Sequence, residues 1–235
     1  MRTLLSILLV VVVGLSAALP ARADVTAQLH RALHERVTVW RRPDGARVYV
    51  SHCRQVIGGC ESRVAAFAQM IFEAAERHGI DPFVLAAIAM RESALDPGAI
   101  GATGEAGIVQ LHPRGVGARV RFVNDAQYRS LCVRRPAACQ GPVLDRGAEL
   151  LARCVAQCGT LEAGLGMYNS GECDPRRAYV RRVLSEASAL HALVNDDAAI
   201  EPQPVPLPLA PTSGPPTIEL TAVRPAPAPR PTPNR

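Results

Sequence analysis

Lysine is absent from this sequence, and every one of its 26 basic residues is an arginine. Aromatic residues are also scarce, at 4% of the chain. A nucleic-acid-binding surface needs clustered cations and often uses aromatic rings to stack bases. Because the arginines are scattered and the aromatic side chains are few, the net charge of +5 does not indicate such a surface. This charge mildly favours an anionic polymer as the partner.

Long apolar runs are missing beyond the first 23 residues. The run Leu4–Leu19 follows Arg2 and precedes the small-residue sequence that ends at Ala23. This pattern is typical of a secretory signal peptide, so we expect residues 1–23 to be removed and the protein to be periplasmic or extracellular. The alternative is a membrane anchor, although a run of 16 residues is slightly shorter than the roughly 17 to 25 needed to span a bilayer.

The sequence also lacks histidines and cysteines at the spacing of a metal site. No histidine lies at ligand spacing from a close pair of cysteines, which argues against a zinc site, and we expect no metal and no cofactor. In an exported protein the seven cysteines predict disulfides instead. Cys53 with Cys60, Cys132 with Cys139, and Cys158 with Cys173 are the candidate pairs. The last pair would leave Cys154 free, and a bond between Cys154 and Cys173 is the open alternative.

Proline is concentrated at the end of the chain, where it makes up 12 of the 35 residues 201–235. Such a composition predicts an extended, disordered tail, which we place at 196–235. We expect it to be a spacer, or else a ligand for a cell-wall or secretion-machine protein. Residues 24–60 are predicted to form an N-terminal helix and hairpin, and residues 61–195 one helical domain of a monomeric protein.

Apolar spacing predicts a mainly α fold with a small N-terminal β-hairpin and disulfides. The hairpin is expected around the turn at 43–45, and residues 94–141 are expected to be mainly loop, with a short helix near 116–122. A helix starting at Asp81 and Pro82 should continue into Ser93. The other helices are expected at 25–35, 61–78, 142–157, 160–168 and 175–193.

Glu92 lies near the end of that helix, whose body 83–90 is apolar on all sides and therefore buried. It follows Ile88 by four residues and Leu85 by seven, so it shares their inward face. Burial disfavours an ionised carboxylate and raises its pKa. A carboxylic acid of this kind can protonate a glycosidic oxygen. The helix alone leaves a structural alternative, in which Glu92 is paired with an arginine or a helix N-terminus.

Three short motifs occur in order after this helix. They are Glu92-Ser93, the stretch Gly104-Glu-Ala-Gly107-Ile-Val-Gln110-Leu-His112-Pro113, and Met167-Tyr168-Asn169-Ser170-Gly171. Together they resemble, in order and spacing, the motifs of the soluble lytic transglycosylase (SLT) family. The resemblance covers about residues 64–184 and implies a lysozyme-like helical domain that acts on peptidoglycan strands.

The resemblance also implies roles for individual residues. Glu92 would be the single catalytic acid and base, which cleaves the bond between N-acetylmuramic acid and N-acetylglucosamine and leaves a 1,6-anhydromuramoyl product. The implied substrate-binding residues are Ser93, Gly104, Gly107, Gln110, Tyr168 and Asn169. Gln110 could instead be a surface amide and Tyr168 a core side chain, and the glycines could serve an ordinary tight turn.

The sequence departs from the family pattern at several positions. Gly101 stands where a serine that contacts the muramoyl substituent is usual, and Glu105 stands where a small residue is usual. His112 and Met167 replace a methionine and an alanine. Glu105 and His112 are therefore additional candidate site residues, with a solvated loop position as the alternative for each.

Two other functions stay open at the level of sequence. A lysozyme-type hydrolase needs a second carboxylate, for which Glu105 and Asp96 are the candidates, although Asp96 precedes a proline in a position typical of turn capping. A peptidoglycan-binding module without turnover is the third hypothesis. The loss of the serine at Gly101 favours it, whereas the presence of Glu92, Gln110 and Tyr168 argues against it.

Overall fold

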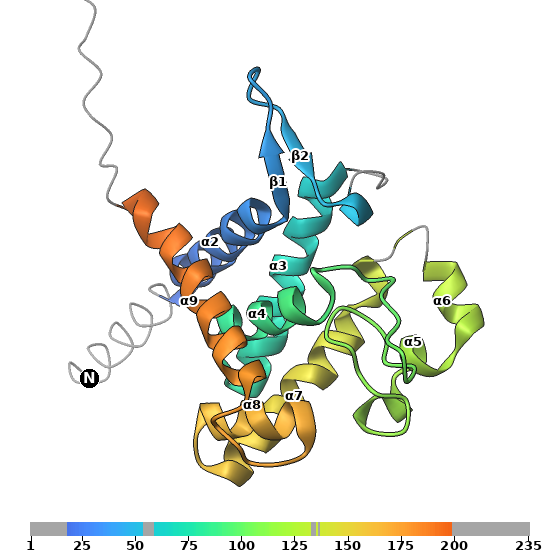
Figure 1. Cartoon of the computed structure of the whole chain (residues 1–235). Helices are drawn as coiled ribbons and strands as arrows, with labels where there is room; N and C mark the ends of the chain where they lie inside the picture. The colour runs from blue at the N-terminus through green and yellow to red at the C-terminus, as the bar shows by residue number, and fades with distance from the viewer. Residues whose placement is uncertain (1–17, 54–58, 133–134, 136, 199–235) are drawn as a thin grey trace, which may run out of the picture. The chain divides into compact units, whose positions relative to one another are not determined.

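The computed structural model describes residues 18–53, 59–132, 135 and 137–198. This part of the chain is mainly helical, with one small antiparallel sheet, as the sequence predicts (Figure 1). Most of the predicted signal peptide and nearly all of the predicted tail lie outside the described residues. Among the described helices, none is long and apolar enough to span a membrane.

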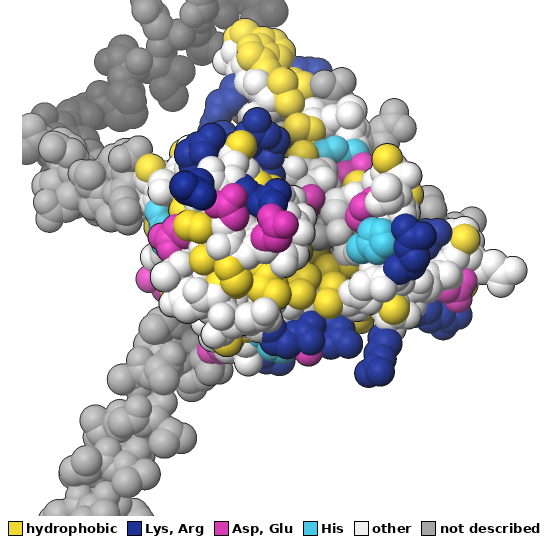
Figure 2. Space-filling view, turned by 60° about the horizontal axis from the view of Figure 1, so that its bottom comes forward, with side chains coloured by type: hydrophobic (Ala, Val, Ile, Leu, Met, Phe, Trp, Pro, Cys, Tyr) yellow, Lys and Arg dark blue, Asp and Glu magenta, His cyan; other side chains and the backbone are white. Residues whose placement is uncertain are grey.

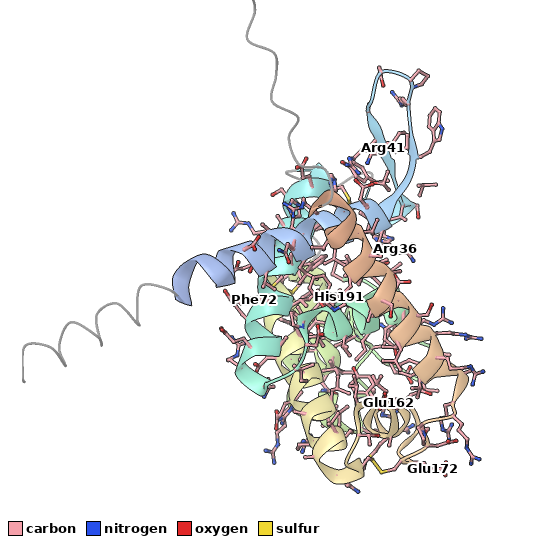
Figure 3. All side chains as sticks on the ribbon, turned by 90° about the vertical axis from the view of Figure 1, so that its left-hand side faces the viewer. Arg36, Arg41, Phe72, Glu162, Glu172 and His191 are labelled. Carbon is pink, nitrogen blue, oxygen red and sulfur yellow. A yellow bond between two sulfur atoms is a disulfide. The ribbon has the colours of Figure 1, made fainter. Side chains whose placement is uncertain are left out.

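Helix α4 (Pro82–Ser93) is the central helix of the fold. The Asp81 carboxylate accepts a hydrogen bond from the Phe83 amide at 2.7 Å, which caps the helix as predicted. All seven residues from Phe83 to Ala89 are buried. Helices α3 (Gly59–His78) and α9 (Ala178–Ala198) pack against α4. The ring of His191, which Figure 3 labels on α9, stacks on Phe83 of α4.

Helices α7 (Gly141–Cys158) and α8 (Leu161–Ser170) form the lower part of the domain in Figure 1. Helix α7 packs on both α3 and α8. The approach of α7 and α8 is close, because a Cβ atom at Gly164 would lie 2.6 Å from Cγ2 of Val155. The side chain of Thr160 accepts a hydrogen bond from the Ala163 amide at 3.2 Å and caps α8. These contacts hold the first half of α8, whose last turn carries Tyr168 and Asn169.

The N-terminal part consists of helix α2 (Ala18–Val37) and the predicted hairpin. Strand β1 (Thr38–Arg41) pairs antiparallel with β2 (Arg47–Tyr49). The hairpin is joined to α2 by polar contacts: Glu35 accepts a hydrogen bond from Arg47 at 2.6 Å, and His34 lies 2.9 Å from the Tyr49 hydroxyl. Leu29 and Leu33 of α2 are fully buried, so this extension shares the core of the domain.

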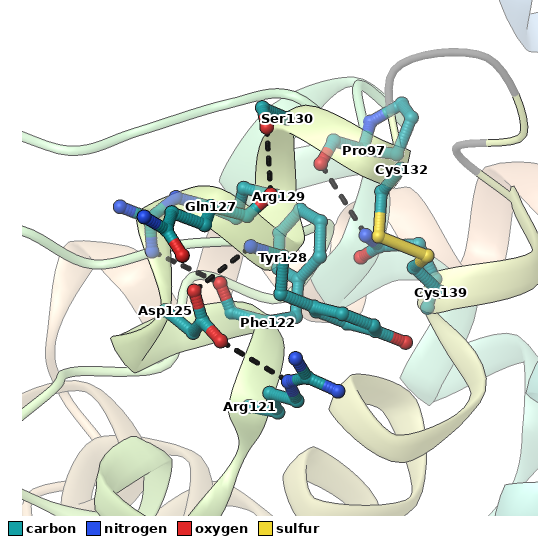
Figure 4. Close-up of a disulfide and its surroundings, with 11 residues drawn as sticks. Pro97, Arg121, Phe122, Asp125, Gln127, Tyr128, Arg129, Ser130, Cys132 and Cys139 are labelled. Carbon is teal, nitrogen blue, oxygen red and sulfur yellow. Dashed lines mark hydrogen bonds and ion pairs between the residues drawn. A yellow bond between two sulfur atoms is a disulfide. The ribbon is translucent and has the colours of Figure 1, made fainter.

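Residues 94–141 contain more helix than the sequence predicts. The structure has η2 (Val116–Arg119), α5 (Arg121–Asn124), α6 (Ala126–Cys132) and η3 (Ala137–Cys139). Asp125 accepts a hydrogen bond from the Tyr128 amide at 2.8 Å, while the guanidinium of Arg121 lies over the Tyr128 ring (Figure 4). These side chains and the Cys132–Cys139 disulfide hold short helices that apolar spacing alone does not reveal.

The three predicted disulfides are present. They join Cys53 to Cys60, Cys132 to Cys139 and Cys158 to Cys173. Cys154 is a buried free thiol, so the alternative bond between Cys154 and Cys173 is not formed. The Cys158–Cys173 bond spans 15 residues and encloses all of α8. It ties the end of α7 to the segment that follows α8.

Candidate active site

A cavity of about 490 Å³ contains six of the predicted site residues: Glu92, Glu105, Gln110, His112, Tyr168 and Asn169. Leu111, Gly115, Val116 and Leu150 complete its lining. The residues come from α4, from the loop after it and from α7 and α8. Figure 2 shows this side of the molecule, with acidic and histidine side chains near a hollow and arginines gathered beside them.

Glu92 lies in the last turn of α4, one helical turn beyond the fully buried Ile88. Desolvation by burial raises the pKa of its carboxyl group above the ordinary value of 4.5, and the negative charge of Glu105 adds to this effect. Tyr179 and the charge of Arg91 act in the opposite direction. The net result is a carboxylic acid that keeps its proton at higher pH than an exposed glutamate, so it can donate that proton to a bound group.

Two tyrosines lie near this carboxyl group. The Tyr168 hydroxyl donates a hydrogen bond to the Val109 carbonyl at 3.1 Å, so it holds the loop rather than bonding to Glu92. The Tyr179 hydroxyl is buried and makes no hydrogen bond of ordinary geometry in the described structure, yet it is close enough to Glu92 to favour the ionised carboxylate. Burial raises the pKa of both phenols, so both stay protonated and can donate.

The loop that follows α4 is held close to α7. Gly107 has a φ angle of 84°, and a Cβ atom there would lie 2.7 Å from Val143 and 2.9 Å from the amide oxygen of Gln140. That oxygen accepts a hydrogen bond from the Ile108 amide, and the Gln140 nitrogen donates to the Pro97 carbonyl. Gly107 is therefore needed for close approach as well as for its backbone angle.

Some of the predicted substrate-binding residues contact the loop after α4 rather than the space of the cavity. Ser93, Gly104 and Gly107 do not line the cavity, and the Ser93 hydroxyl donates to the Ile108 carbonyl at 2.9 Å. The Gln110 amide nitrogen donates to the carbonyls of Ala99 and Gly107 at 3.1 and 2.8 Å. Both N–H groups of the Gln110 amide are thus hydrogen-bonded within the loop, although the side chain reaches the cavity.

Glu105 is the second carboxylate of the cavity, and its environment differs from that of Glu92. The Thr103 hydroxyl and the Thr103 amide both donate to it, and these bonds lower the pKa of the Glu105 carboxyl group. Asp96, the other candidate, does not line the cavity and accepts a hydrogen bond from the Gly98 amide at 2.9 Å. This is the turn-capping geometry that its position before Pro97 suggests.

His112 points into the same cavity from the loop. Its Nδ1 accepts a hydrogen bond from the Arg114 amide at 3.1 Å, which fixes the tautomer with the proton on Nε2 when the ring is neutral. Among the described residues, no three histidine, cysteine or acidic side chains are grouped so that they could hold a metal ion.

Sequence reasoning did not single out Gln140 or Tyr179. Gln140 is fully buried, and its two partners lie 32 and 43 residues away in the chain. Tyr179 approaches Glu92 only because α9 packs on α4. The one available signal for Gln140 was its position immediately before the Gly-Pro start of α7, which does not reveal these partners.

Residues 69–183 match the family model described as "Transglycosylase SLT domain". The chain carries a transglycosylase SLT domain. The match begins within α3 and ends within α9, so the SLT domain contains all of the residues that line the cavity. Neither the curated proteins nor the solved structures that were compared gave a match. Residues 69–183 are thus a domain of the lysozyme-like superfamily and of the lytic-transglycosylase type, a type of domain whose substrate is peptidoglycan.

Proposed function

We propose that this protein is a peptidoglycan lytic transglycosylase in which Glu92 is the only catalytic carboxyl group. The observation that carries the proposal is the contrast between the two acids of the cavity. Burial favours the protonated form of Glu92, whereas hydrogen bonds from Thr103 favour the ionised form of Glu105. One acid is therefore prepared to give a proton, and the other is not.

The reaction that we propose needs one proton shuttle. Glu92 donates its proton to the oxygen that joins N-acetylmuramic acid to N-acetylglucosamine, and the bond from this oxygen to the anomeric carbon breaks. The ionised Glu92 then takes the proton of the muramoyl C6 hydroxyl as that oxygen attacks the anomeric carbon. The N-acetylglucosamine side leaves with a free hydroxyl, and the muramoyl side becomes a 1,6-anhydro sugar. No water is consumed.

Three features support this arrangement. Gln110 and Asn169 line the cavity around Glu92, where the Asn169 amide and the Gln110 amide oxygen can bond to a sugar, while Tyr168 holds the loop through the Val109 carbonyl. The Tyr179 phenol stays protonated, so it can stabilise the carboxylate that forms when Glu92 has given its proton. The Leu111, Val116 and Leu150 side chains supply apolar surface in the same cavity.

Product analysis tests the proposal. Purified sacculi are digested with the full chain and with Glu92→Gln, which keeps the shape of the side chain and removes its acid. We expect anhydromuramoyl products, each lighter by one water than a hydrolysis product, and at least about a 100-fold loss of rate in the variant, in line with the contribution of a general acid. Mass spectrometry measures both. Reducing muramoyl ends alone would refute transglycosylation.

A hydrolase is the second candidate function, because Glu105 lines the same cavity and is ionised. In that case Glu105 would activate a water and Glu105→Gln would abolish turnover. The transglycosylase proposal expects that variant to keep the anhydro product. If the wild-type protein pelleted with sacculi and released no product, the peptidoglycan-binding function would hold instead.

The location of the protein outside the cytoplasm is part of the proposal. A cell-wall substrate and three disulfides agree with an exported protein that acts outside the cytoplasm. Edman sequencing of the secreted protein would test the predicted signal-peptide cleavage, which should give Asp24 as the first residue.

A further inference from the structure

Glu105 is a fixed anion in the cavity. One of its carboxylate oxygens accepts a hydrogen bond from the Thr103 hydroxyl, and the other accepts one from the Thr103 amide at 3.2 Å. Its backbone is also held, since the Gly101 amide donates to the Glu105 carbonyl at 2.8 Å. The two side-chain bonds hold the carboxylate in one orientation, and the backbone bond holds the residue that carries it.

The position of this carboxylate depends on Gly101. A Cβ atom at position 101 would overlap the Oε2 atom of Glu105, and it would lie 3.2 Å from the Glu105 Cβ and 3.0 Å from the Gln110 side-chain oxygen. A side chain at 101 and the observed Glu105 carboxylate therefore exclude one another. Two of the loop positions at which the sequence departs from the SLT pattern are thus in contact, and an acid fills the space left by the missing side chain.

The negative charge of Glu105 has no arginine partner among the residues that the structure describes. Other glutamates pair with arginines, as Glu186 does with Arg36 and Glu172 with Arg177, each at 2.6 Å. The described lining of the cavity includes no arginine, and His112 is its only side chain that can become a cation. An ionised carboxylate in a ligand cavity forms its strongest hydrogen bonds with a charged donor. The missing donor is then expected on the ligand.

We propose that Glu105 binds a primary ammonium group of the substrate, next to the bond that Glu92 cleaves, and so selects wall polymer that carries free amino groups. This inference rests on the proposed function for the identity of the polymer. Such an ammonium group has two sources: an amino sugar without its acetyl group, or an amine on the peptide attached to the glycan. Both present the same charged donor to the carboxylate.

Binding measurements on the inactive Glu92→Gln protein test this without turnover. Isothermal titration calorimetry compares a glucosamine oligomer with an N-acetylglucosamine oligomer of equal length. It also compares an acetylated muropeptide that has a free side-chain amine with the same muropeptide after acetylation of that amine. We expect the free amine to bind about 2- to 5-fold more tightly in at least one pair, which is the range for an exposed charge pair.

Substitution of Glu105 should remove the preference. In the Glu92→Gln background, Glu105→Gln is expected to equalise the affinities within each pair and to leave the acetylated ligands unaffected. Glu162→Gln is the matched control, because Glu162 is an exposed residue at the start of α8 and is not part of the cavity lining (Figure 3). The control should keep the full preference. Raising the ionic strength should weaken the preference in every variant that shows it.

Gly101 gives an independent variant that leaves the charge in place. Gly101→Ala should push the carboxylate from its position and abolish the preference, although Glu105 itself is unchanged. Adding Gly101→Ala to Glu105→Gln should then have no further effect on the preference, because both changes remove the same interaction. Such non-additive behaviour would show that the preference depends on the position of the Glu105 carboxylate and not only on its charge.

Each outcome has one meaning. A preference in the glucosamine pair alone assigns the site to an amino sugar, and a preference in the muropeptide pair alone assigns it to a peptide amine. Equal affinities within both pairs, or a preference that survives Glu105→Gln, would overturn the inference. Because turnover is not measured, failure to form anhydro products from sacculi would leave this result intact and would count against the proposed function only.

Discussion

The Glu92 carboxyl group is suited to proton donation at a cost in folding stability. The environment of Glu92 favours the neutral acid, because desolvation acts more strongly than the contacts with Tyr179 and Arg91. At neutral pH an ionised Glu92 is therefore less favourable in the folded chain than in the unfolded chain. Placing an acid where it can act as a proton donor costs the fold some stability, a trade that is common at active sites.

This cost predicts a pH-dependent stability for Glu92→Gln. The folded-state pKa of Glu92 is raised above 4.5, so its ionisation destabilises the fold progressively as the pH rises from about 4.5 through the raised value. Glutamine is neutral throughout. We expect the variant to melt at the same temperature as the wild type near pH 4 and at a higher temperature near pH 8, by about 2 to 4 °C for each kcal/mol.

Differential scanning fluorimetry across this pH range measures the difference. Glu162→Gln again serves as the control, since it removes a charge from an exposed position. Its melting temperature should follow the wild type near pH 4 and lie slightly below it near pH 8, the opposite direction to Glu92→Gln, because an ionised acid in the first turn of α8 stabilises that helix. A variant Glu92→Gln that melted below the wild type at pH 8 would mean that the ionised carboxylate is stabilised by its contacts, contrary to the raised pKa.

At the scale of elements, α8 is the part of the site with the most restraints. It begins at the Thr160 cap, packs closely on Val155 of α7, and is enclosed by the Cys158–Cys173 disulfide. Its last turn carries Tyr168 and Asn169 into the cavity. A crosslink over 15 residues stabilises a fold by about 3 kcal/mol, mainly by restricting the unfolded chain.

The double variant Cys158→Ser/Cys173→Ser should therefore lose about 3 kcal/mol in the free energy of unfolding. It should also bind glycan more weakly, because the segment that positions Tyr168 and Asn169 is no longer closed. Urea denaturation gives the first quantity and calorimetry with an N-acetylglucosamine oligomer gives the second.

Cys53→Ser/Cys60→Ser is the matched control for that variant. This disulfide joins η1 (Ser51–Cys53) to the start of α3, and none of the described residues of its loop lines the cavity. We expect a similar loss of stability and unchanged affinity. Equal losses of affinity in the two double variants would show that the Cys158–Cys173 bond has no special part in the site.

The elements that the sequence predicts well are those whose apolar spacing is regular. Helices α3, α4 and α7 begin and end within about two residues of the predicted bounds, a normal margin. Helix α6 was missed, because it depends on the Asp125 cap and on a disulfide rather than on an apolar stripe. The resemblance to the SLT motifs implied that Glu92 and Tyr168 belong to one site, and both line the cavity, but it did not show that Tyr168 bonds to Val109.

At the scale of the whole molecule, the folded core includes residues that lie before the SLT match. The match begins at residue 69, whereas α2 lies wholly before it. Leu29, Ala32 and Leu33 of α2 are nevertheless fully buried in the same core cluster as Leu85 and Leu144. The helix packs on both α3 and α9, which flank the helix of Glu92 (Figure 1). The N-terminal extension is thus a structural part of the domain.

Leu33→Ala should accordingly destabilise the entire domain, by about 2 to 5 kcal/mol for a large-to-small change in a core. We expect one cooperative transition at a lower temperature, recorded by circular dichroism, rather than separate loss of the extension. The control is Val39→Ala in β1, where the side chain is 62% exposed and the change should stay within about 0.5 kcal/mol. A two-step transition in Leu33→Ala would show that α2 unfolds independently.

The contact between Gly101 and Glu105 also limits how this loop can evolve. A side chain at position 101 would occupy the space of the Glu105 carboxylate, and the carboxylate in turn denies that space to any side chain. A single substitution at position 101 crowds the loop, and a single substitution of Glu105 by a small residue removes the polar group from it. The two positions are therefore expected to covary, because a hydroxyl side chain at 101 requires the Glu105 carboxylate to move or to be replaced.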